Sequence, residues 1–344
     1  MTTKRLGFFS RLLDNATAAE RYRLVTEQIV QAEKVGFDST WIAQHHFHEA
    51  EGGLPSPFVF LAHVAARTSR IRLGTGVITL PMENPVRVAE DAAVLDLLSG
   101  GRLEVGLGTG ATPASFEAFG LQASQRGEIF GRYYQTVLDA WRGRRLGHDE
   151  NHLYPAAPHL IDRVWQATFS VAGGIRAGQA GDGLMLSRTQ PRPADDPDAT
   201  LSDIQHPVID AYLAALPPGR TPRILGSRTL FVADDRKEAL RYAEIGLNAA
   251  LDRFIASGHK VRGRTLADLI AAFDVHIGTP DEVIESLQAD TALSRATDLV
   301  FQVHSIDPPH PLILRSLELV ADKVAPALGW PGRTVEPRLA VVAG

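Results

Sequence analysis

Short apolar runs of strand type alternate with amphipathic helical patterns along most of this sequence, and this alternation constrains the fold more than any other feature. The apolar runs are nearly continuous, which is typical of parallel strands buried on both faces. Such a chain folds as an open doubly wound sheet or as a closed barrel, and spacing alone does not separate the two. The eight predicted strands are residues 5–10, 39–43, 71–80, 102–107, 164–170, 183–187, 224–232 and 298–303.

Helical patterns lie between the predicted strands. The first begins near Ala18, and Gly36 stands where the C-terminus of a helix commonly has a glycine. Two segments break the pattern, residues 189–203 and 249–264, and both are predicted to be long loops, the first of them a candidate lid. Further helices are predicted at residues 57–67, 85–98, 125–141 and 173–180, and after Asp234, Thr279 and Pro311.

Composition narrows the chemistry that this chain can perform. There is no cysteine among the 344 residues, so disulfides, thiolate nucleophiles and iron–sulfur clusters are excluded, and redox chemistry requires a bound cofactor. The formal net charge of −5 argues against a nucleic-acid partner. No apolar stretch approaches the length of a membrane span, and the N-terminus does not resemble a secretion signal. We therefore expect a cytoplasmic protein that binds small molecules.

Three histidines, His45, His46 and His48, follow the second predicted strand, where a barrel places catalytic groups. His45 and His46 point to opposite sides of an extended chain, so a metal ion would need His45, His48 and distant carboxylates that the sequence does not identify. We predict no metal site here. His45 can instead transfer protons or donate a hydrogen bond, because its pKa is expected near neutrality, whereas His48 is interpreted as a loop residue.

Two glycine-rich turns are candidates for binding a cofactor phosphate. Gly106, Gly108 and Gly110 have G-x-G-x-G spacing rather than the G-x-G-x-x-G of dinucleotide-binding folds, and no clean helix is expected directly after them. The turn from Ser170 to Gly173 joins a strand to a helix, whose free N–H groups suit a phosphate. An ordinary turn with Ser170 as the helix N-cap explains the same residues equally well.

Four segments of the chain resemble the luciferase-like flavin monooxygenase family. They are WIAQHHF (residues 41–47), RIRLGTGVITLPMENPVRVAEDAAVLDLLSGGRLEVGLGTG (70–110), FEAFG (116–120) together with Arg126, and AGQAGDGLML (177–186). The resemblance implies an α/β fold of TIM type, a (β/α)8 barrel with long loop insertions at its C-terminal face. A single domain is expected over residues 1–330, followed by a C-terminal tail at 331–344.

The resemblance also implies a function. FMN, reduced by a partner flavin reductase or by NAD(P)H, would react with O2 at the C-terminal end of the barrel, and a small, partly apolar organic substrate would be oxidised. Two alternatives stay open: a deazaflavin-dependent dehydrogenase or reductase on the same barrel, and a non-catalytic flavin-binding protein. The family commonly forms homodimers through early helices, which would here be residues 57–67 and 85–98.

Carried over by position, the resemblance assigns roles to individual residues. His45 matches the catalytic histidine of the family. Gly76 and Val77 match a strand-end bulge beneath the flavin ring, where a non-proline cis peptide is often found, and Thr109 and Gly110 match the turn beside the flavin. The residues expected to contact the flavin phosphate are Arg126, Ser170, Val171 and Gly173, with Arg188 as a further candidate.

Two positions depart from the pattern of the family. Gln44 stands where many relatives carry a glutamate, and Thr109 stands where some relatives place an arginine against the phosphate. Losing that arginine removes a charge-assisted hydrogen bond. We expect Arg126, or Arg188 reaching in from the next strand end, to replace it.

Overall fold

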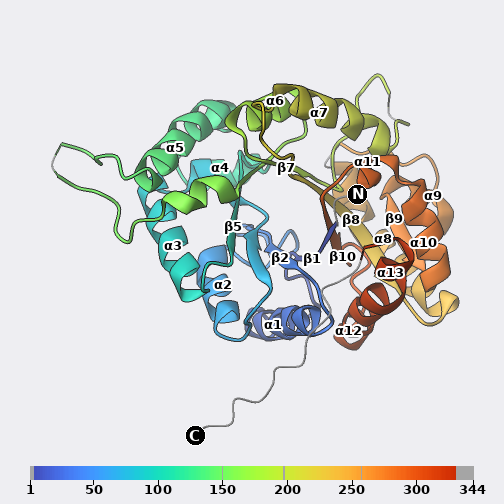
Figure 1. The fold of residues 1–344 in the computed structure, drawn as a ribbon. Coiled ribbons are helices and arrows are strands. Elements are labelled where there is room, and N and C mark those ends of the chain that lie inside the picture. The colour runs from blue at the N-terminus through green and yellow to red at the C-terminus, as the bar shows by residue number, and fades with distance from the viewer. Residues whose placement is uncertain (1–3, 149, 197, 257, 331–344) are drawn as a thin grey trace, which may run out of the picture.

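Parallel strands close into a barrel, and the helices are arranged around it (Figure 1). The computed structural model describes residues 4–148, 150–196, 198–256 and 258–330, so the tail predicted at 331–344 lies outside the described residues. The strands are β1 (Arg5–Ser10), β2 (Ser39–Ile42), β3 (Arg72–Thr75), β4 (Ile78–Thr79), β5 (Leu103–Gly108), β6 (Val164–Ala167), β7 (Gly183–Leu186), β8 (Ile224–Val232), β9 (Val275–Gly278) and β10 (Asp298–Gln302).

The order of the strands confirms the predicted barrel. The ring runs β1, β2, β3, β5, β6, β7, β8 and β10, and β10 pairs with β1 as well as with β8, so no edge is left open. All eight predicted strands are present. The run predicted at 71–80 is divided into β3 and β4 around Gly76 and Val77, and β4 pairs with the last residues of β5. One further strand, β9, was not predicted, and it pairs with the second half of β8 outside the ring.

Helices connect the strands and cover the outside of the barrel. They are α1 (Ala18–Lys34), α2 (Pro57–Ala65), α3 (Pro85–Leu98), α4 (Pro113–Ala118), α5 (Arg126–Trp141), α6 (Val171–Ala180), α7 (Leu201–Ala215), α8 (Arg236–Ala256), α9 (Leu266–Ala272), α10 (Pro280–Ala289), α11 (Thr291–Ser294), α12 (His310–Leu319) and α13 (Ala325–Ala327). Shorter helical turns are η1 (Leu80–Met82), η2 (Ala123–Gln125), η3 (Pro158–Arg163) and η4 (Val320–Val324). No helix in the described part of the chain is long and apolar enough to cross a membrane.

Local signals explain where these helices begin and end. Asn84 caps α3 by accepting hydrogen bonds from the N–H groups of Val86 and Arg87. Gly36 follows the end of α1 with a φ of 102°, as predicted for this position. A capping box between Thr200 and Asp203 starts α7, so the predicted loop at 189–203 ends three residues early.

The predicted loop at 249–264 is wrong in its first half. Helix α8 continues to Ala256, because Leu247, Ala250 and Leu251 extend its buried stripe at helical spacing. A second correction concerns the segment after Gly110, where no clean helix was expected. The short helix α4 begins there at Pro113, in the first helical position that proline favours.

Two buried tryptophans pack against each other in the barrel. The rings of Trp41 on β2 and Trp165 on β6 meet edge to face, with their centroids 5.5 Å apart. Strand glycines make room for them, because a Cβ atom at Gly74 or Gly183 would lie 2.2 Å from the Trp41 or Trp165 ring, respectively. The barrel is therefore a packed core, and only its ends are available for a site.

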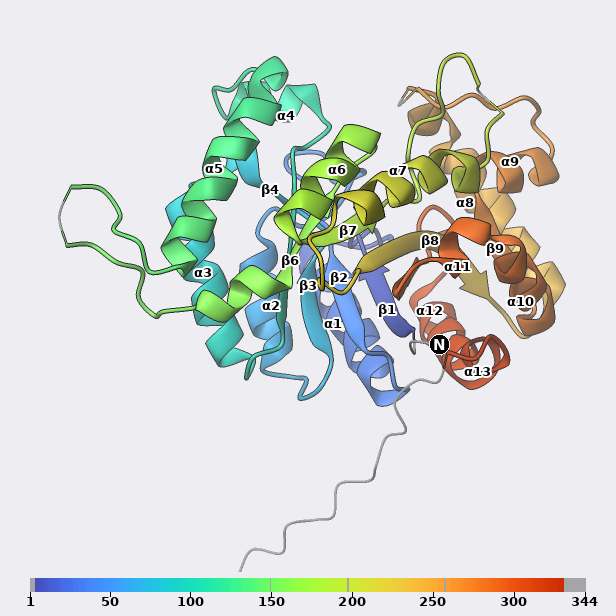
Figure 2. The ribbon, with the colours of Figure 1, turned by 45° about the horizontal axis from the view of Figure 1, so that its top comes forward.

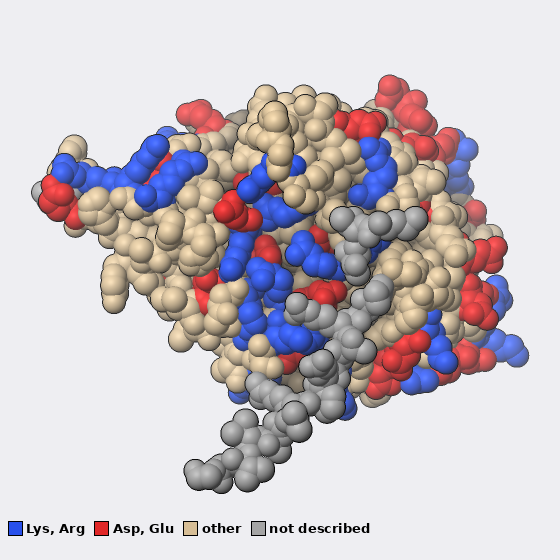
Figure 3. All heavy atoms as spheres, viewed as in Figure 1, with Lys and Arg blue, Asp and Glu red and all other residues tan. Residues whose placement is uncertain are grey.

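Ion pairs join neighbouring strands at their N-terminal ends. Arg5 at the start of β1 pairs with Asp298 at 2.8 Å, and Arg72 at the start of β3 pairs with Glu104. Figure 3, seen from the same side as Figure 1, shows basic side chains with acidic ones between them near the middle of that face. Because Arg5 and Arg72 are paired with carboxylates of neighbouring strands, this end of the barrel is interpreted as structural.

Candidate active site

The C-terminal ends of the strands bring together most of the residues predicted from the sequence. Figure 2 shows α4, α6 and α7 near the loops at this end of the barrel. Arg126 is the exception, since it is the first residue of α5 and is exposed to solvent. The residues at strand ends are His45 after β2, Gly76 and Val77 between β3 and β4, Thr109 and Gly110 after β5, Ser170, Val171 and Gly173 after β6, and Arg188 after β7.

His45 is held by the loop that follows it. Its backbone N–H donates to the carbonyl oxygen of Leu54 at 2.9 Å, which folds residues 46–54 back over the imidazole. A Cβ atom at Gly52 would lie 2.4 Å from the imidazole ring, so only glycine permits this packing. Glu51 places a carboxylate oxygen 3.8 Å from Nδ1 of His45, which is too long for a hydrogen bond but close enough for an electrostatic interaction.

The surroundings of His45 keep its imidazole neutral at pH 7. Burial lowers its pKa below the ordinary value, Glu51 opposes this shift, and the positive charge of Arg11 adds to it. The interaction with His45 in turn lowers the pKa of Glu51, which stays ionised. A neutral imidazole facing a carboxylate through Nδ1 carries its proton there, which leaves Nε2 free to accept a proton.

The neighbouring histidines have different surroundings. His46 packs edge-on against Phe119, with ring centroids 4.9 Å apart. Its Nε2 atom is buried and has no hydrogen-bond partner within the described residues. His48 is exposed, in agreement with its interpretation as a loop residue. In the described part of the chain, no group of three or more histidine, aspartate or glutamate side chains is placed to hold a metal ion.

Gln44 ties the end of β2 to the chain around β4. Its amide oxygen accepts from the N–H of Thr79 at 2.7 Å, and its amide nitrogen donates to Glu83 at 2.6 Å and to the carbonyl oxygen of Pro55 at 3.0 Å. Burial raises the pKa of Glu83. A glutamate at position 44 would place a second carboxylate against Glu83, and the two would repel each other. A glutamine at this position instead donates a hydrogen bond to Glu83, which explains the departure from the family pattern.

The backbone between β3 and β4 has the predicted cis peptide bond, between Gly76 and Val77. Close packing surrounds this segment, since a Cβ atom at Gly76 would lie 2.6 Å from the Phe9 ring. Gly108 approaches the side chain of Val77 equally closely, and a Cβ atom there would lie 2.7 Å from it. Glycine at both positions therefore allows the backbone to approach the Phe9 ring and the Val77 side chain closely.

The turn after β6 has the geometry of a capped helix N-terminus. The hydroxyl oxygen of Ser170 accepts from the N–H of Gly173 at 3.2 Å, so the N-cap interpretation is correct. The N–H groups of Val171 and Ala172 have no acceptor within the helix and lie in an exposed turn. A Cβ atom at Gly173 would lie 1.9 Å from the Thr168 hydroxyl oxygen, which explains the glycine. This turn can bind an anion and be an N-cap at once.

The family model described as luciferase-like monooxygenase matches residues 7–296 of the chain. The chain belongs to this family. The 4-hydroxyprotoasukamycin monooxygenase of Streptomyces nodosus subsp. asukaensis is 29% identical over 276 residues, which are 74% of this chain and 73% of that relative. The expected family and its class of enzyme, an oxygenating oxidoreductase, are thus confirmed.

Solved structures agree with this assignment. The monooxygenase RslO1 from Streptomyces bottropensis aligns with a TM-score of 0.79 at 26% identity, covering 94% of this chain and 99% of the other. The oxygenating constituent of 3,6-diketocamphane monooxygenase from Pseudomonas putida, in complex with FMN, has a TM-score of 0.74 at 19% identity over 94% and 98% of the two chains, so it shares the fold. The matches also include F420-dependent enzymes.

Two arginines expected near the flavin phosphate have different environments in this luciferase-like barrel. Arg126 is exposed, and its side chain has no hydrogen bond or ion pair among residues 4–330 as far as they are described. Arg188 is only 4% exposed, and burial together with the charge of Arg11 lowers its pKa to about 9. Neither arginine contacts the Ser170 turn through a hydrogen bond, so their roles at the phosphate remain predictions.

Reasoning from the sequence missed two charged residues of the site, Arg11 and Glu51. Arg11 directly follows β1 and donates a hydrogen bond to the carbonyl oxygen of Glu51. Its place at a strand end was a usable signal, because catalytic groups of barrels lie there. Glu51 gave no such signal, since only the folding of the loop back over His45 brings it to the site.

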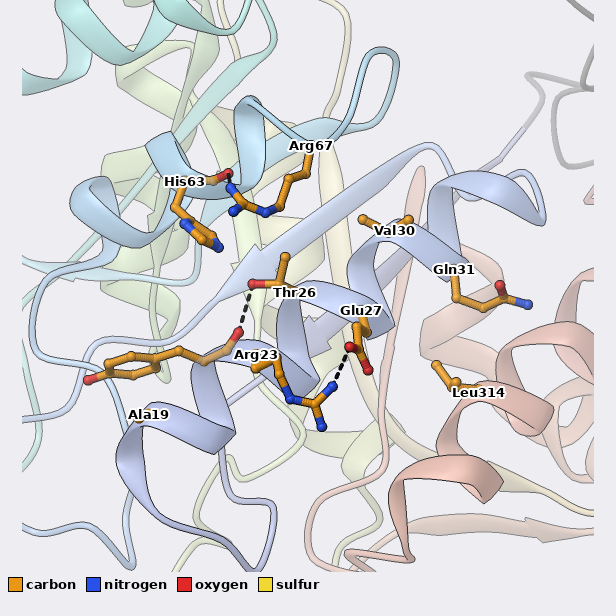
Figure 4. A pocket seen from close by; sticks show the side chains of 10 residues that line it. Ala19, Arg23, Thr26, Glu27, Val30, Gln31, His63, Arg67 and Leu314 are labelled. Carbon is orange, nitrogen blue, oxygen red and sulfur yellow. Dashed lines mark hydrogen bonds and ion pairs between the residues drawn. The ribbon is translucent and has the colours of Figure 1, made fainter.

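A separate hollow of about 780 Å³ opens on the outside of the luciferase-like barrel. It lies between α1, α2 and α12 and is lined by residues such as Tyr22, Arg23, His63 and Leu314 (Figure 4). Arg23 and Glu27 form an ion pair at its edge. None of the residues at the strand ends lines it, so this hollow is distinct from the candidate active site.

Proposed function

We propose that this luciferase-like protein uses reduced FMN and O2 to oxidise a small, partly apolar organic substrate at the C-terminal end of its barrel. The observation that carries the proposal is the setting of His45. A neutral imidazole, flanked by an ionised carboxylate and partly shielded from water, lies at the same end of the barrel as the Gly76–Val77 backbone. Such a group can move a proton during oxidation of a substrate.

The residues present fit FMN in two places. Gly76 and Gly110 stand where the family resemblance places the chain beneath and beside the flavin, and both are packed so closely that only glycine fits. The exposed N-terminus of α6, with the N–H groups of Val171 and Ala172, suits the phosphate. Bound reduced FMN would supply the electrons with which O2 is activated. The FMN complex of the diketocamphane enzyme on the same fold supports this choice of flavin.

His45 is the residue to which we assign proton transfer. Glu51 faces Nδ1, so Nε2 is the atom that accepts a proton from the reacting substrate and returns it. Gln44 does not titrate, and its hydrogen bonds to Thr79 and Glu83 hold the strand end that carries His45. Thr109 and Gly110 follow β5, where they would border the flavin.

The source of reduced flavin is a second part of this proposal. The flavin-dependent trigonelline monooxygenase of Acinetobacter baylyi, 30% identical over 166 residues, is described as an oxygenase component, which implies a partner. We infer that a flavin reductase using NAD(P)H supplies reduced FMN to this chain as well. The cytoplasm, where NAD(P)H is available, is the compartment we propose.

A deazaflavin-dependent hydride transfer is the second candidate, because the F420-dependent glucose-6-phosphate dehydrogenase of Kineococcus radiotolerans is 35% identical over 170 residues. Parallel titrations of the purified protein with reduced FMN and with reduced F420 distinguish the two. We expect tighter binding of FMN. Preference for F420 would reassign the protein to hydride transfer, and binding of neither cofactor would contradict both candidates.

A further inference from the structure

Two arginines at the C-terminal end of the barrel form no ion pair with a carboxylate in the described part of the chain. Arg11 follows β1 and Arg188 follows β7, and β8 and β10 separate these strands in the ring. Both follow strand ends on the same rim of the barrel, both lie near Asp307, and the charge of Arg11 lowers the pKa of Arg188. We refer to Arg11 and Arg188 as the arginine pair.

The guanidinium of Arg188 is buried without a partner. Arg188 is 4% exposed, and its side chain donates no hydrogen bond to any residue that the structure describes. Arg11 donates to the carbonyl oxygen of Glu51, but its Nε atom is buried and has no acceptor among the described residues. Buried charges are normally paired, so an unpaired arginine indicates that a group from outside the protein completes the site.

The nearby carboxylates are engaged with other partners. Asp307 is hydrogen-bonded to the ring of His304, and Asp274 is paired with Arg192. The carboxylate of Glu51 contacts Thr112 at 3.3 Å and faces His45. None of these three carboxylates forms an ion pair with Arg188, so its guanidinium keeps its hydrogen-bond donors available for an anion.

A stack of three rings, His259, Phe254 and Phe273, lies near Arg188. His259 lies close enough for Arg188 to influence its pKa, which burial lowers to about 4, so its imidazole is neutral. The ring of His259 stacks on Phe254 with centroids 3.9 Å apart, and Phe254 stacks on Phe273 at 3.8 Å. In such surroundings a hydrogen bond from a guanidinium to an anion is stronger than it is in water.

We propose that the arginine pair binds a carboxylate on the substrate, so that the substrate of this enzyme is an organic acid. The planar guanidinium of Arg188 matches a carboxylate with two parallel hydrogen bonds. Arg11 links this site to the reaction centre, because its other contact is the loop that holds His45. The inference rests on the proposed function, since it names the substrate class of the same site.

The turn that suits the flavin phosphate has its own donors and makes no hydrogen bond with the arginine pair. The first N–H groups of α6 can bind a phosphate without either arginine, because no hydrogen bond joins Arg11 or Arg188 to Ser170 in the described structure. Arg11 donates to the backbone of Glu51, whose carboxylate faces His45, so an anion bound by Arg11 would lie near the residue to which we assign proton transfer. This location favours a substrate carboxylate over the cofactor.

Calorimetric titration with hexanoate and with hexan-1-ol as its neutral counterpart tests the proposal. The wild-type protein, with and without FMN, should bind hexanoate at least tenfold more tightly than hexan-1-ol. R188M should lose that preference while hexan-1-ol binding stays unchanged. The matched control is R236M, which removes an exposed arginine on α8 that pairs with Glu282 and should keep the preference. Equal binding of both probes, or unchanged hexanoate binding by R188M, would overturn the proposal.

A second titration tests whether Arg188 binds a substrate carboxylate or the phosphate of FMN. FMN and riboflavin differ by the phosphate, so the ratio of their affinities reports on phosphate binding. We expect R188M to keep the wild-type ratio, and a ratio that falls toward one would assign Arg188 to the cofactor phosphate instead. Failure of the wild-type protein to bind any flavin would refute the proposed function, while the hexanoate titration would still decide whether the pair binds an anion.

Thermal unfolding shows whether a variant that fails to bind hexanoate is still folded. Hexanoate should raise the unfolding temperature of the wild-type protein, since a ligand that binds only the folded state stabilises it. R188M should unfold at or above the wild-type temperature and not respond to hexanoate, because it removes an unpaired buried charge. R11M provides an independent variant with the same expected loss of response. A full response in both variants would contradict the assignment.

Discussion

His45 illustrates what a single residue contributes and what its surroundings add. Its position after a buried strand made it a candidate in the sequence alone. The neutrality of its imidazole, however, depends on burial, on Arg11 and on Glu51, which the sequence places far from one another or in an unremarkable loop. Gly52 looks like a loop glycine in the sequence, yet it is the residue that lets the imidazole pack closely.

Replacing His45 with glutamine should remove proton transfer while keeping a polar side chain of similar size. We expect substrate oxidation to fall roughly 10²-fold, the ordinary contribution of a general acid or base. FMN binding should change little. His48→Gln, an exposed neighbour, is the matched control and should retain full activity. Steady-state oxidation rates of the three proteins check this, and wild-type activity in H45Q would remove His45 from the mechanism.

The pH dependence of kcat/KM tests the surroundings of the same imidazole. Burial lowers the pKa of His45, so activity that needs the neutral form is present at pH 7 and lost only as the pH falls below the ordinary histidine range. Glu51 raises this pKa, so Glu51→Gln should move the acidic limb to still lower pH. An acidic limb that moves to higher pH in E51Q would contradict the described arrangement.

At the scale of elements, most of the fold could be predicted because buried strands and amphipathic helices leave periodic signals. The eight strands and the helix Pro85–Leu98 match their predicted positions closely. Prediction failed where the signal was short or interrupted. Strand β9 has four residues, with a histidine at its centre, and the end of α8 was hidden by polar residues between its buried positions.

The N-terminus of α6 is the element on which phosphate binding depends. Proline is tolerated in the first helical position, and Ser170 before it already has extended backbone, with φ −133° and ψ 151°. Val171→Pro should therefore keep the helix and delete one N–H group. FMN affinity should fall about tenfold, the effect of one hydrogen bond to a charged group, and riboflavin affinity should stay unchanged. Equal loss for both flavins would indicate a structural defect instead.

Arg126, at the start of α5, is the second candidate for binding the FMN phosphate. It was predicted to contact the phosphate, and the structure leaves its side chain exposed and without an ion pair in the part of the chain that is described. Arg126→Ala should weaken FMN binding relative to riboflavin if the side chain reaches the phosphate. Unchanged FMN affinity would refute this role and leave the α6 N-terminus as the phosphate site.

At the scale of the whole molecule, we propose that a second copy of the chain covers the outer faces of α2 and α3, as the family resemblance implies. Helix α2 exposes Val59 (74%), and α3 exposes the consecutive apolar residues Leu97 (62%) and Leu98 (67%). Leu98→Glu should convert a dimer into a monomer, whereas Ile245→Glu, at a position of α8 that is 58% exposed, should not. Light scattering at micromolar concentration decides, and a monomeric wild-type protein would refute the dimer.

The measurement that tests the central claim most directly is the fate of O2 in the reduced FMN complex. The wild-type protein is loaded with FMN, reduced without air, and mixed with ¹⁸O2 in the presence of short-chain acids, ketones and aldehydes. A monooxygenase should incorporate one ¹⁸O atom into an organic product, and H45Q should lose most of that incorporation. Recovery of all the oxygen as hydrogen peroxide, at the rate given by free reduced FMN, would contradict the account.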